Sequence, residues 1–359
     1  MTGAVDWATA RRVALRGSSR KAPPTGTGSF RTLAADMAEL TPQAEALVTA
    51  QTGLVSEAGP ARARVVNRAM WIDANISSFQ RLLGPLVDKL AHTGGSSRLA
   101  GIGSRFAGTE VGVVLGWMST RVLGQYDLLI TEDDRPEDQD IVYYVGPNLM
   151  ALEARHDFDP RQFRLWLALH EVTHRAQFTG VPWMREHFLG LVNQTIDAVD
   201  PDPKRLLESA KEIIEARREG RDVLADGGIA TLLASPEQRV VLDKVTGLMS
   251  LLEGHGDITM DRAGADLIPS AGRFARVLRE RRNSARGVSK LFQRLIGIEA
   301  KMNQYVAGEA FIEAVEAVGG SELVDRAWES SDNLPTMPEI RDPQSWVDRI
   351  SSAPVLAAS

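Results

Sequence analysis

The amino-acid sequence predicts an α+β protein that is predominantly α-helical and has a small central β-sheet. Apolar residues recur three or four positions apart over most of the chain, which is the spacing of one face of an α-helix. Two short runs near the middle, YDLLIT at 126–131 and DIVYYV at 140–145, have the composition of β-strands. No repeat is visible along the chain, so we expect neither a solenoid nor a propeller.

The composition excludes several kinds of chemistry. The chain has 359 residues and no cysteine, which rules out disulfides, cysteine nucleophiles, iron–sulfur clusters and thiolate zinc sites. A metal would therefore have to be bound by aspartate, glutamate or the six histidines. The 41 basic and 47 acidic residues give a net charge of −6, which does not favour nucleic acid as a partner.

Membrane insertion and secretion are not expected either. The apolar, glycine-containing segment 108–124 is short and includes Glu110 and Arg121, so it predicts a buried helix that packs closely against its neighbours. The N-terminus contains Asp6 and no apolar block, unlike a secretory signal. We therefore expect a cytoplasmic protein.

Along the chain we expect a short N-terminal segment followed by one large domain. Residues 1–30 combine a helical pattern around Trp7 and Val13 with a flexible connection, KAPPTGTGS. The single domain is expected over 31–350. Its predicted parts are helices over 31–125 (with a continuous helical pattern from Thr32 to about Leu90), the sheet at 126–146, a helix over 159–179, a helical insertion over 183–240, a helix over 243–262 and C-terminal helices over 270–350.

The most informative motif is His170-Glu171-Val172-Thr173-His174, an H-E-x-x-H pattern. Residues four apart lie on one face of a helix, so both imidazoles can bind one Zn²⁺ ion. Glu171 lies beside this face, where its carboxylate can accept a proton from a water that the metal activates. The spacing therefore predicts His170 and His174 as zinc ligands and Glu171 as a general base.

The sequence around the motif fits this prediction. Asp159 is a good N-cap and Pro160 suits the first helical position, whereas Gly180 and Pro182 indicate the end of the helix. The predicted strand at 140–145 comes directly before this helix. Its edge could hold an extended peptide across the metal by backbone pairing.

A catalytic zinc usually has three protein ligands, and the continuation that would supply a third histidine in metzincins is absent after His174. In the segment 248–261, Glu253 and Asp257 are four apart on one predicted helical face. Glu253 is the favoured third ligand, and Asp257 could accept the second N–H of a ligating histidine. Gly254 and Gly256 would suit a helix that lies tightly against the H-E-x-x-H helix.

His255 is the competing third ligand, but it points about 200° away from Glu253 on a regular helix. His255 could alternatively stabilise a developing oxyanion, as could Tyr305 or Tyr144. For each of these three side chains, a structural role is the simpler interpretation.

Three other features have simple interpretations. The basic run 273–294 is expected to be a solvated helix face and not a nucleic-acid surface, because few aromatics are interleaved with it. The segment GIGSRF at 101–106 lacks the third glycine of a dinucleotide loop. The acidic turn 132–140 lacks calcium-ligand spacing and is expected to be an exposed loop.

The H-E-x-x-H helix followed by E-x-x-x-D resembles the gluzincin branch of the metallopeptidases. More specifically, the chain resembles the actinobacterial zincin-like metallopeptidase type 2 family, often labelled as associated with deazaflavin-coenzyme biosynthesis. The resemblance implies a zinc-binding, zincin-like fold, and the biosynthetic label assigns no reaction. The segments that carry it are VLGQYDLLI (Val122–Ile130), YYVGPNL (Tyr143–Leu149), LHEVTHRAQF (Leu169–Phe178), SLLEGHGDITMD (Ser250–Asp261) and GIEAKMNQYVAGEAF (Gly297–Phe311).

The sequence thus predicts a zinc-dependent metallohydrolase, specifically a peptidase that acts on a peptide or protein. The alternative is a catalytically inactive zincin-like scaffold, in which the metal is structural and the protein binds a partner. The sequence leaves both hypotheses open.

Overall fold

The structure of the protein is a computed structural model that describes residues 5–19, 27–82, 97–128, 140–197, 236–283 and 298–352. The chain divides into two compact units. The first contains Met1–Gly180 and Thr259–Phe274, and the second contains Val181–Ile258 and Ala275–Ser359. Each unit is described by itself below.

A three-stranded mixed sheet lies in the first unit, in the order β1 (Arg62–Val66), β3 (Ile141–Val145), β2 (Gly124–Tyr126). β1 runs parallel to β3, with Val65 opposite Tyr144, and β2 runs antiparallel to β3, with Gly124 opposite Tyr144. All five residues of the central strand β3 are buried. The described residues are otherwise mainly helical, so the predicted fold class is confirmed.

The sheet differs from the prediction in its outer strands. β1 lies within the segment expected to be continuously helical from Thr32 to about Leu90, so that expectation is wrong over Arg62–Val66 and over residues 53–61, which precede the strand without helical structure. β2 begins earlier than the predicted run and ends at Tyr126, and residues 129–139 lie outside the described part of the chain. β1 is five residues long and β2 is three residues long, and the extended conformation of both depends on pairing with β3.

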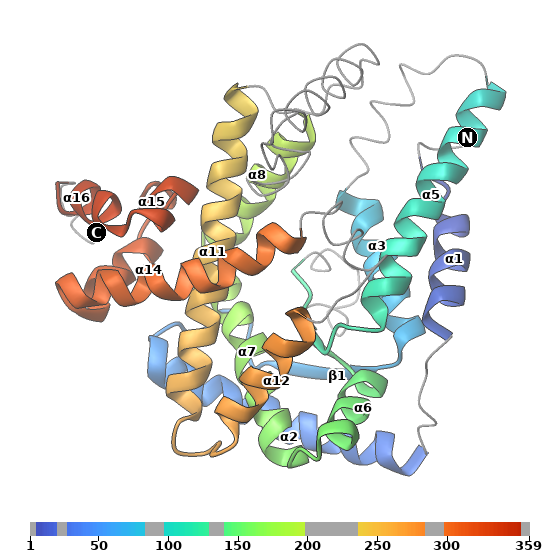
Figure 1. The fold of residues 1–359 in the computed structure, drawn as a ribbon, viewed down its shortest axis with the longest axis horizontal. Helices are drawn as coiled ribbons and strands as arrows, with labels where there is room; N and C mark the ends of the chain where they lie inside the picture. The colour runs from blue at the N-terminus through green and yellow to red at the C-terminus, as the bar shows by residue number, and fades with distance from the viewer. Residues whose placement is uncertain are drawn as a thin grey trace. The chain divides into compact units, whose positions relative to one another are not determined.

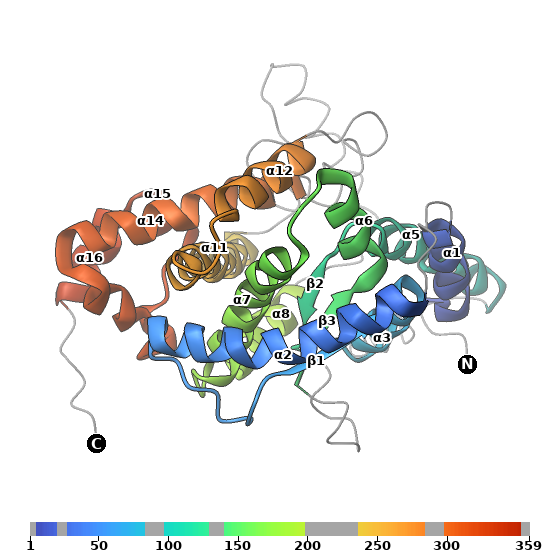
Figure 2. The same ribbon diagram turned by 90° about the horizontal axis from the view of Figure 1, so that it is seen from below.

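Helices cover both faces of the sheet in the first unit (Figures 1 and 2). On one face, side chains of β1 and β3 share a core with α1, α3 and α5. On the other face, α2 and α7 pack against each other, and Tyr144 of β3 contacts Thr41 of α2. The helices that lie wholly within the described part of the first unit are α1 (Trp7–Ser19), α2 (Thr27–Thr52), α3 (Arg68–Leu82), α5 (Ser97–Ser119), α6 (Gly146–His156) and α7 (Pro160–Thr179).

Of the glycine-containing segment predicted to be a tightly packed helix, residues 108–119 form the C-terminal half of α5, whereas residues 120–124 lie beyond its end. A Cβ atom on Gly112 would lie 2.5 Å from the carbonyl oxygen of Ala10 in α1. Only a residue without a side chain permits this approach. The expected close packing of this segment is therefore confirmed, and the neighbouring helix is α1.

The second unit is helical in its described part. A Cβ atom on Gly254 of α11 would lie 2.3 Å from the carbonyl carbon of Gly308 in α14, so the backbones of these helices touch. α14 is kinked at Gly319 and Gly320, where Gly320 has φ = 70°. The helices are α8 (Met184–Asp197), α11 (Pro236–Gly264, whose last turn belongs to the first unit), α12 (Ala271–Asn283, shared likewise), α14 (Ile298–Asp325), α15 (Met337–Arg341) and α16 (Pro343–Ser352), with short 3-10 turns at Arg326–Trp328 and Ser331–Asn333.

None of the helices in the described ranges combines the length and the apolar character that crossing a membrane requires.

Candidate metal centre

Local sequence signals determine where α7, the helix of the H-E-x-x-H motif, begins and ends. The Asp159 carboxylate accepts a hydrogen bond from the backbone N–H of Gln162 at 2.8 Å, and Pro160 occupies the first turn. The helix ends at Thr179 with Gly180 as its C-cap. The helix predicted over 159–179 is therefore confirmed together with its caps.

Two buried arginines fix α7 to its neighbours in the first unit. Arg164 binds both carboxylate oxygens of Glu153 at 2.8 Å and also pairs with Asp36 of α2. Bidentate pairs of this kind restrict both distance and orientation. The motif is thus presented by a helix with little freedom to rotate.

Arg175, which directly follows the second histidine of the motif, has 1% of its side chain exposed. Its guanidinium donates to Asp140 at 3.0 Å, to Glu45 of α2 at 2.5 Å and to the carbonyl of Gly59 at 2.6 Å. These bonds link α7 to α2 and to the start of β3. Asp140, expected in an exposed acidic loop, is instead buried, and the rest of that turn lies outside the described residues.

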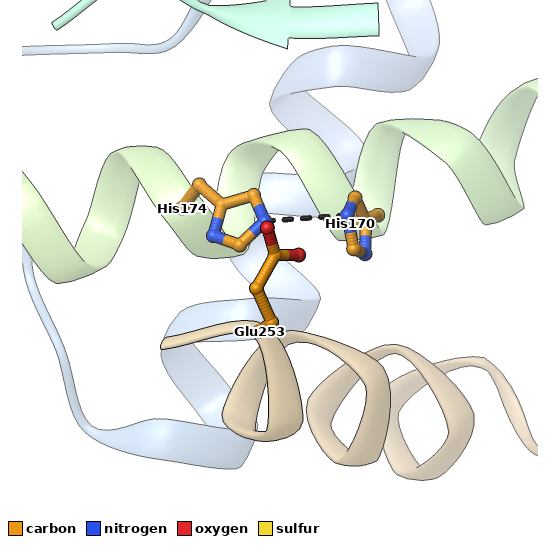
Figure 3. Close-up of side chains that lie close together, drawn as sticks. All are labelled: His170, His174 and Glu253. Carbon is orange, nitrogen blue, oxygen red and sulfur yellow. Dashed lines mark hydrogen bonds between the residues drawn. The ribbon is translucent and has the colours of Figure 1, made fainter. Parts of the chain in front are cut away.

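The two histidines of the motif point their Nε2 atoms at each other, 3.2 Å apart, from successive turns of α7 (Figure 3). Two nitrogens that bind one tetrahedral Zn²⁺ at about 2.0–2.1 Å are about 3.3 Å apart. The pair His170 and His174 therefore has the spacing that a single zinc ion needs, and the donor type fits as well.

His174 has a second contact that the sequence analysis missed. Its Nδ1 atom lies 3.0 Å from the amide oxygen of Gln177, one turn further along α7. The signal in the sequence is a polar amide three residues after the motif, on the buried side of the helix. Asp257, predicted as a hydrogen-bond partner of a ligating histidine, lies on α11 in the second unit, and that role stays a prediction.

Glu171 lies against the backbone of β2. Glu171 is 7% exposed. A Cβ atom on Gly124 of β2 would lie 2.6 Å from the Oε1 atom of Glu171. Burial, together with the charge of Glu171, raises the pKa of Tyr144 well above its ordinary value. The carboxylate thus lies beside a strand in which only glycine leaves space for it.

Glu253 is a buried residue of α11. One ligand atom from each of His170, His174 and Glu253 lies within 4.8 Å of the others, and this is the group of potential metal ligands found among the described residues (Figure 3). Gly254, expected to allow close packing against the H-E-x-x-H helix, instead meets Gly308 of α14. The small residue next to Glu253 therefore fixes α11 within its own unit.

Among the described side chains, two other predicted site residues, His255 and Tyr144, have different partners. His255 is buried, and its ring packs edge-on against Trp328 at 5.0 Å within the second unit. The hydroxyl of the fully buried Tyr144 forms a hydrogen bond with Thr41 at 2.9 Å. Tyr305 lies in α14, but its side chain is outside the described part. The packing of His255 and Tyr144 is that of structural residues, and an oxyanion role for either stays a prediction.

The sheet next to α7 is arranged differently from the expectation. Along the chain, the helix α6 comes between β3 and α7, so the strand at 140–145 does not lead directly into the H-E-x-x-H helix. β3 is paired on both sides and has no open edge, whereas β2 is at an edge of the described sheet. Backbone pairing with a peptide would therefore involve an outer strand and not β3, and of the two outer strands of the described sheet, β1 and β2, it is β2 that lies beside Glu171.

The basic run has a structural role in its described part. Arg273 of α12 donates to the backbone carbonyls of His156 at 2.6 Å and of Asp157 at 3.2 Å, where α6 ends. Cationic groups at the C-terminal end of a helix are favoured by its dipole. Residues 284–294 of the run lie outside the described residues.

Comparison with known proteins agrees with this geometry. A comparison with curated proteins finds no match. A crystal structure from Chloroflexus aurantiacus, described as a proposed hydrolase with a novel fold, is 30% identical, with a TM-score of 0.71, covering 98% of this chain and 100% of the other. The model of a zincin-like metallopeptidase family matches residues 5–347. The chain therefore belongs to the zincin-like metallopeptidase family.

Proposed function

We propose that the protein is a zinc-dependent hydrolase that cleaves peptide bonds. The observation that carries the proposal is the pair of Nε2 atoms of His170 and His174, which are 3.2 Å apart. Glu171 lies between the two histidines in the sequence of the same helix. Membership of the zincin-like metallopeptidase family and the similarity to a proposed hydrolase support a metallohydrolase.

His170, His174 and Glu253 would hold the zinc ion, because their ligand atoms lie within 4.8 Å of one another. A bound zinc ion polarises a carbonyl group and lowers the pKa of water to about 7. Glu171 would accept the proton of the attacking water, and later return it to the leaving amine. A histidine pair with one carboxylate is a ligand set of water-activating zinc enzymes.

The edge of β2 supports a peptide as the substrate. Leu123 and Asp127, on either side of β2, form backbone hydrogen bonds to β3: Leu123 accepts from Val145 at 2.8 Å and Asp127 donates to Ile141 at 3.1 Å. Because alternate residues of an antiparallel strand face opposite sides, the N–H and C=O groups of Gly124 and Tyr126 face away from β3. An extended peptide paired with this edge would pass beside Glu171.

β2 is also held from both faces, as a strand that aligns a substrate should be. On one face, Gln125 accepts from the indole N–H of Trp71 at 2.8 Å and donates to Asn75 at 3.2 Å. On the other face, the ring of Tyr126 stacks on Phe178 of α7 at 6.4 Å. The position of the edge relative to α7 is therefore set by side chains from two helices.

The variant Glu171→Gln tests the proposal. It removes the proton acceptor but no metal ligand, so we expect hydrolysis of a peptide library to fall by about 10²–10⁴-fold. The zinc content, measured by mass spectrometry, should equal that of the wild type.

The peptidase hypothesis would be contradicted if the wild-type protein retained zinc but cleaved every member of the library no faster than Glu171→Gln does. That result would favour the alternative, a scaffold with a structural metal.

A further inference from the structure

We propose that Gln177 is a positioning residue that holds His174 in the tautomer needed for metal binding. The inference rests on the proposed zinc function and adds a residue to the site. The amide oxygen of Gln177 lies 3.0 Å from Nδ1 of His174. A carbonyl oxygen only accepts hydrogen bonds, so Nδ1 carries the proton and Nε2 keeps its lone pair.

The direction of that lone pair gives the contact its significance. Nε2 of His174 points at Nε2 of His170, 3.2 Å away. If Nε2 carried the proton, a metal ion would have to displace it before it could bind. The hydrogen bond at Nδ1 decides which nitrogen is protonated, so Gln177 prepares Nε2 as a ligand before metal arrives.

Gln177 is well placed to act with constant geometry. Its side chain has 0% exposure, and it lies three residues after His174 on the same helix, so both groups move together with α7. A buried amide must find hydrogen-bond partners, and this requirement fixes its rotamer. In this chain the functional pattern is therefore H-E-x-x-H-x-x-Q, from His170 to Gln177.

The neutral amide also sets the charge of the centre. The carboxylates of Glu171 and Glu253 would balance the charge of a zinc ion held here, and the amide of Gln177 would add none. A carboxylate at this position would make the ligand more basic and the zinc less electrophilic. Gln177 would therefore fix the tautomer without adding charge to the centre.

The experiment compares three full-length variants: Gln177→Leu, Gln177→Glu and the control Gln162→Leu. Leucine has a similar size but accepts no hydrogen bond, and glutamate keeps an acceptor oxygen. Gln162 belongs to the first turns of the same helix and accepts from the N–H of Ser270 at 3.2 Å. The control therefore also loses one hydrogen bond of α7, far from the histidines in sequence.

Two quantities are measured: the zinc affinity, by competition with a chromophoric chelator, and the tautomer of His174 in metal-free protein, by ¹⁵N NMR of the imidazoles above their titration range. We expect Gln177→Leu to lower the zinc affinity by about 10–100-fold. The wild type and Gln177→Glu should show the Nδ1–H tautomer, which Gln177→Leu should lose. The control should match the wild type in both measurements.

Unchanged zinc affinity in Gln177→Leu, or a proton on Nε2 of His174 in the metal-free wild type, would overturn the inference while leaving the zinc enzyme intact. A wild type that binds no zinc would overturn the proposed function together with it. Gln177→Glu covers the case in which Gln177→Leu does not fold, because this variant keeps the acceptor oxygen, and a tautomer of His174 unlike that of the wild type would then count against the inference.

Discussion

Gly124 limits the space available to the proposed general base. A Cβ atom at this position would lie 2.6 Å from both Cγ and Oε1 of Glu171, closer than real Cβ contacts allow. The strand on which Gly124 lies is also held by Gln125 and Tyr126, so it has little freedom to retreat. The carboxylate would therefore have to move if a side chain were added.

The variant Gly124→Ala should accordingly impair the reaction without removing the metal. A displacement of about 1 Å can cost about 10²-fold in rate, and we expect a loss of kcat of that order. Peptide hydrolysis and zinc content measured together check the expectation. Gly272→Ala, where a Cβ atom meets nothing within 4 Å, is the matched control; equal rates in the two variants would contradict the steric argument.

At the scale of elements, the caps of α7 were predictable from the sequence, because Asp159, Pro160 and Gly180 act within one turn of the helix ends. β1 was not predictable, because its five residues become a strand only through pairing with β3. The role of Gln177 was missed for another reason. A single amide three residues after a motif has no periodicity and becomes meaningful only when its contact with His174 is seen.

The crossing of α11 and α14 next to Glu253 can be tested separately. A Cβ atom on Gly308 would lie 2.0 Å from the carbonyl oxygen of Ser250. Because the atom it would meet belongs to the backbone, a side chain at this position would force the two helices apart. We expect Gly308→Ala to lower the free energy of unfolding by about 1–3 kcal/mol and to weaken zinc binding, since the helix that bears Glu253 must shift.

The control for this crossing is Gly190→Ala in α8 of the same unit, where a Cβ atom meets nothing within 4 Å. A glycine-to-alanine change in an open helix position should stabilise the protein by up to about 1 kcal/mol. Denaturant unfolding and zinc competition check both variants. If Gly308→Ala behaved like Gly190→Ala, the close crossing would have no role in positioning Glu253.

At the scale of the whole molecule, the family match from residue 5 to 347 spans both compact units. α11 belongs to both of them, since its residues from Thr259 onward are in the first unit. There a Cβ atom on Gly264 would lie 3.2 Å from the side chain of Leu169, which precedes the H-E-x-x-H motif. Glu253 was proposed as the third ligand from its helical spacing in the sequence, whereas its proximity to the histidines depends on the tertiary structure.

Acid should destabilise the molecule partly through Glu339 at the start of α15. Burial alone would raise its pKa, but hydrogen bonds from Arg349 and Thr336 lower it below the ordinary value. A carboxylate whose pKa is lower in the folded state stabilises the protein above its unfolded pKa, and this contribution is lost as the pH falls through the folded pKa. The stability difference between wild type and Glu339→Gln, measured by denaturant unfolding, should therefore shrink as the pH is lowered below about 4.3. A difference that stays constant down to the acid transition would contradict this.

The most direct test of the central claim is the zinc content of reconstituted protein, measured by mass spectrometry for the wild type and for single variants of the centre. We predict one zinc ion per chain in the wild type and in Glu171→Gln, and loss of that ion after chelation or in His170→Ala, His174→Ala and Glu253→Ala. Wild-type protein that takes up no zinc, or a His170→Ala variant that retains a full equivalent, would contradict the assignment of this centre.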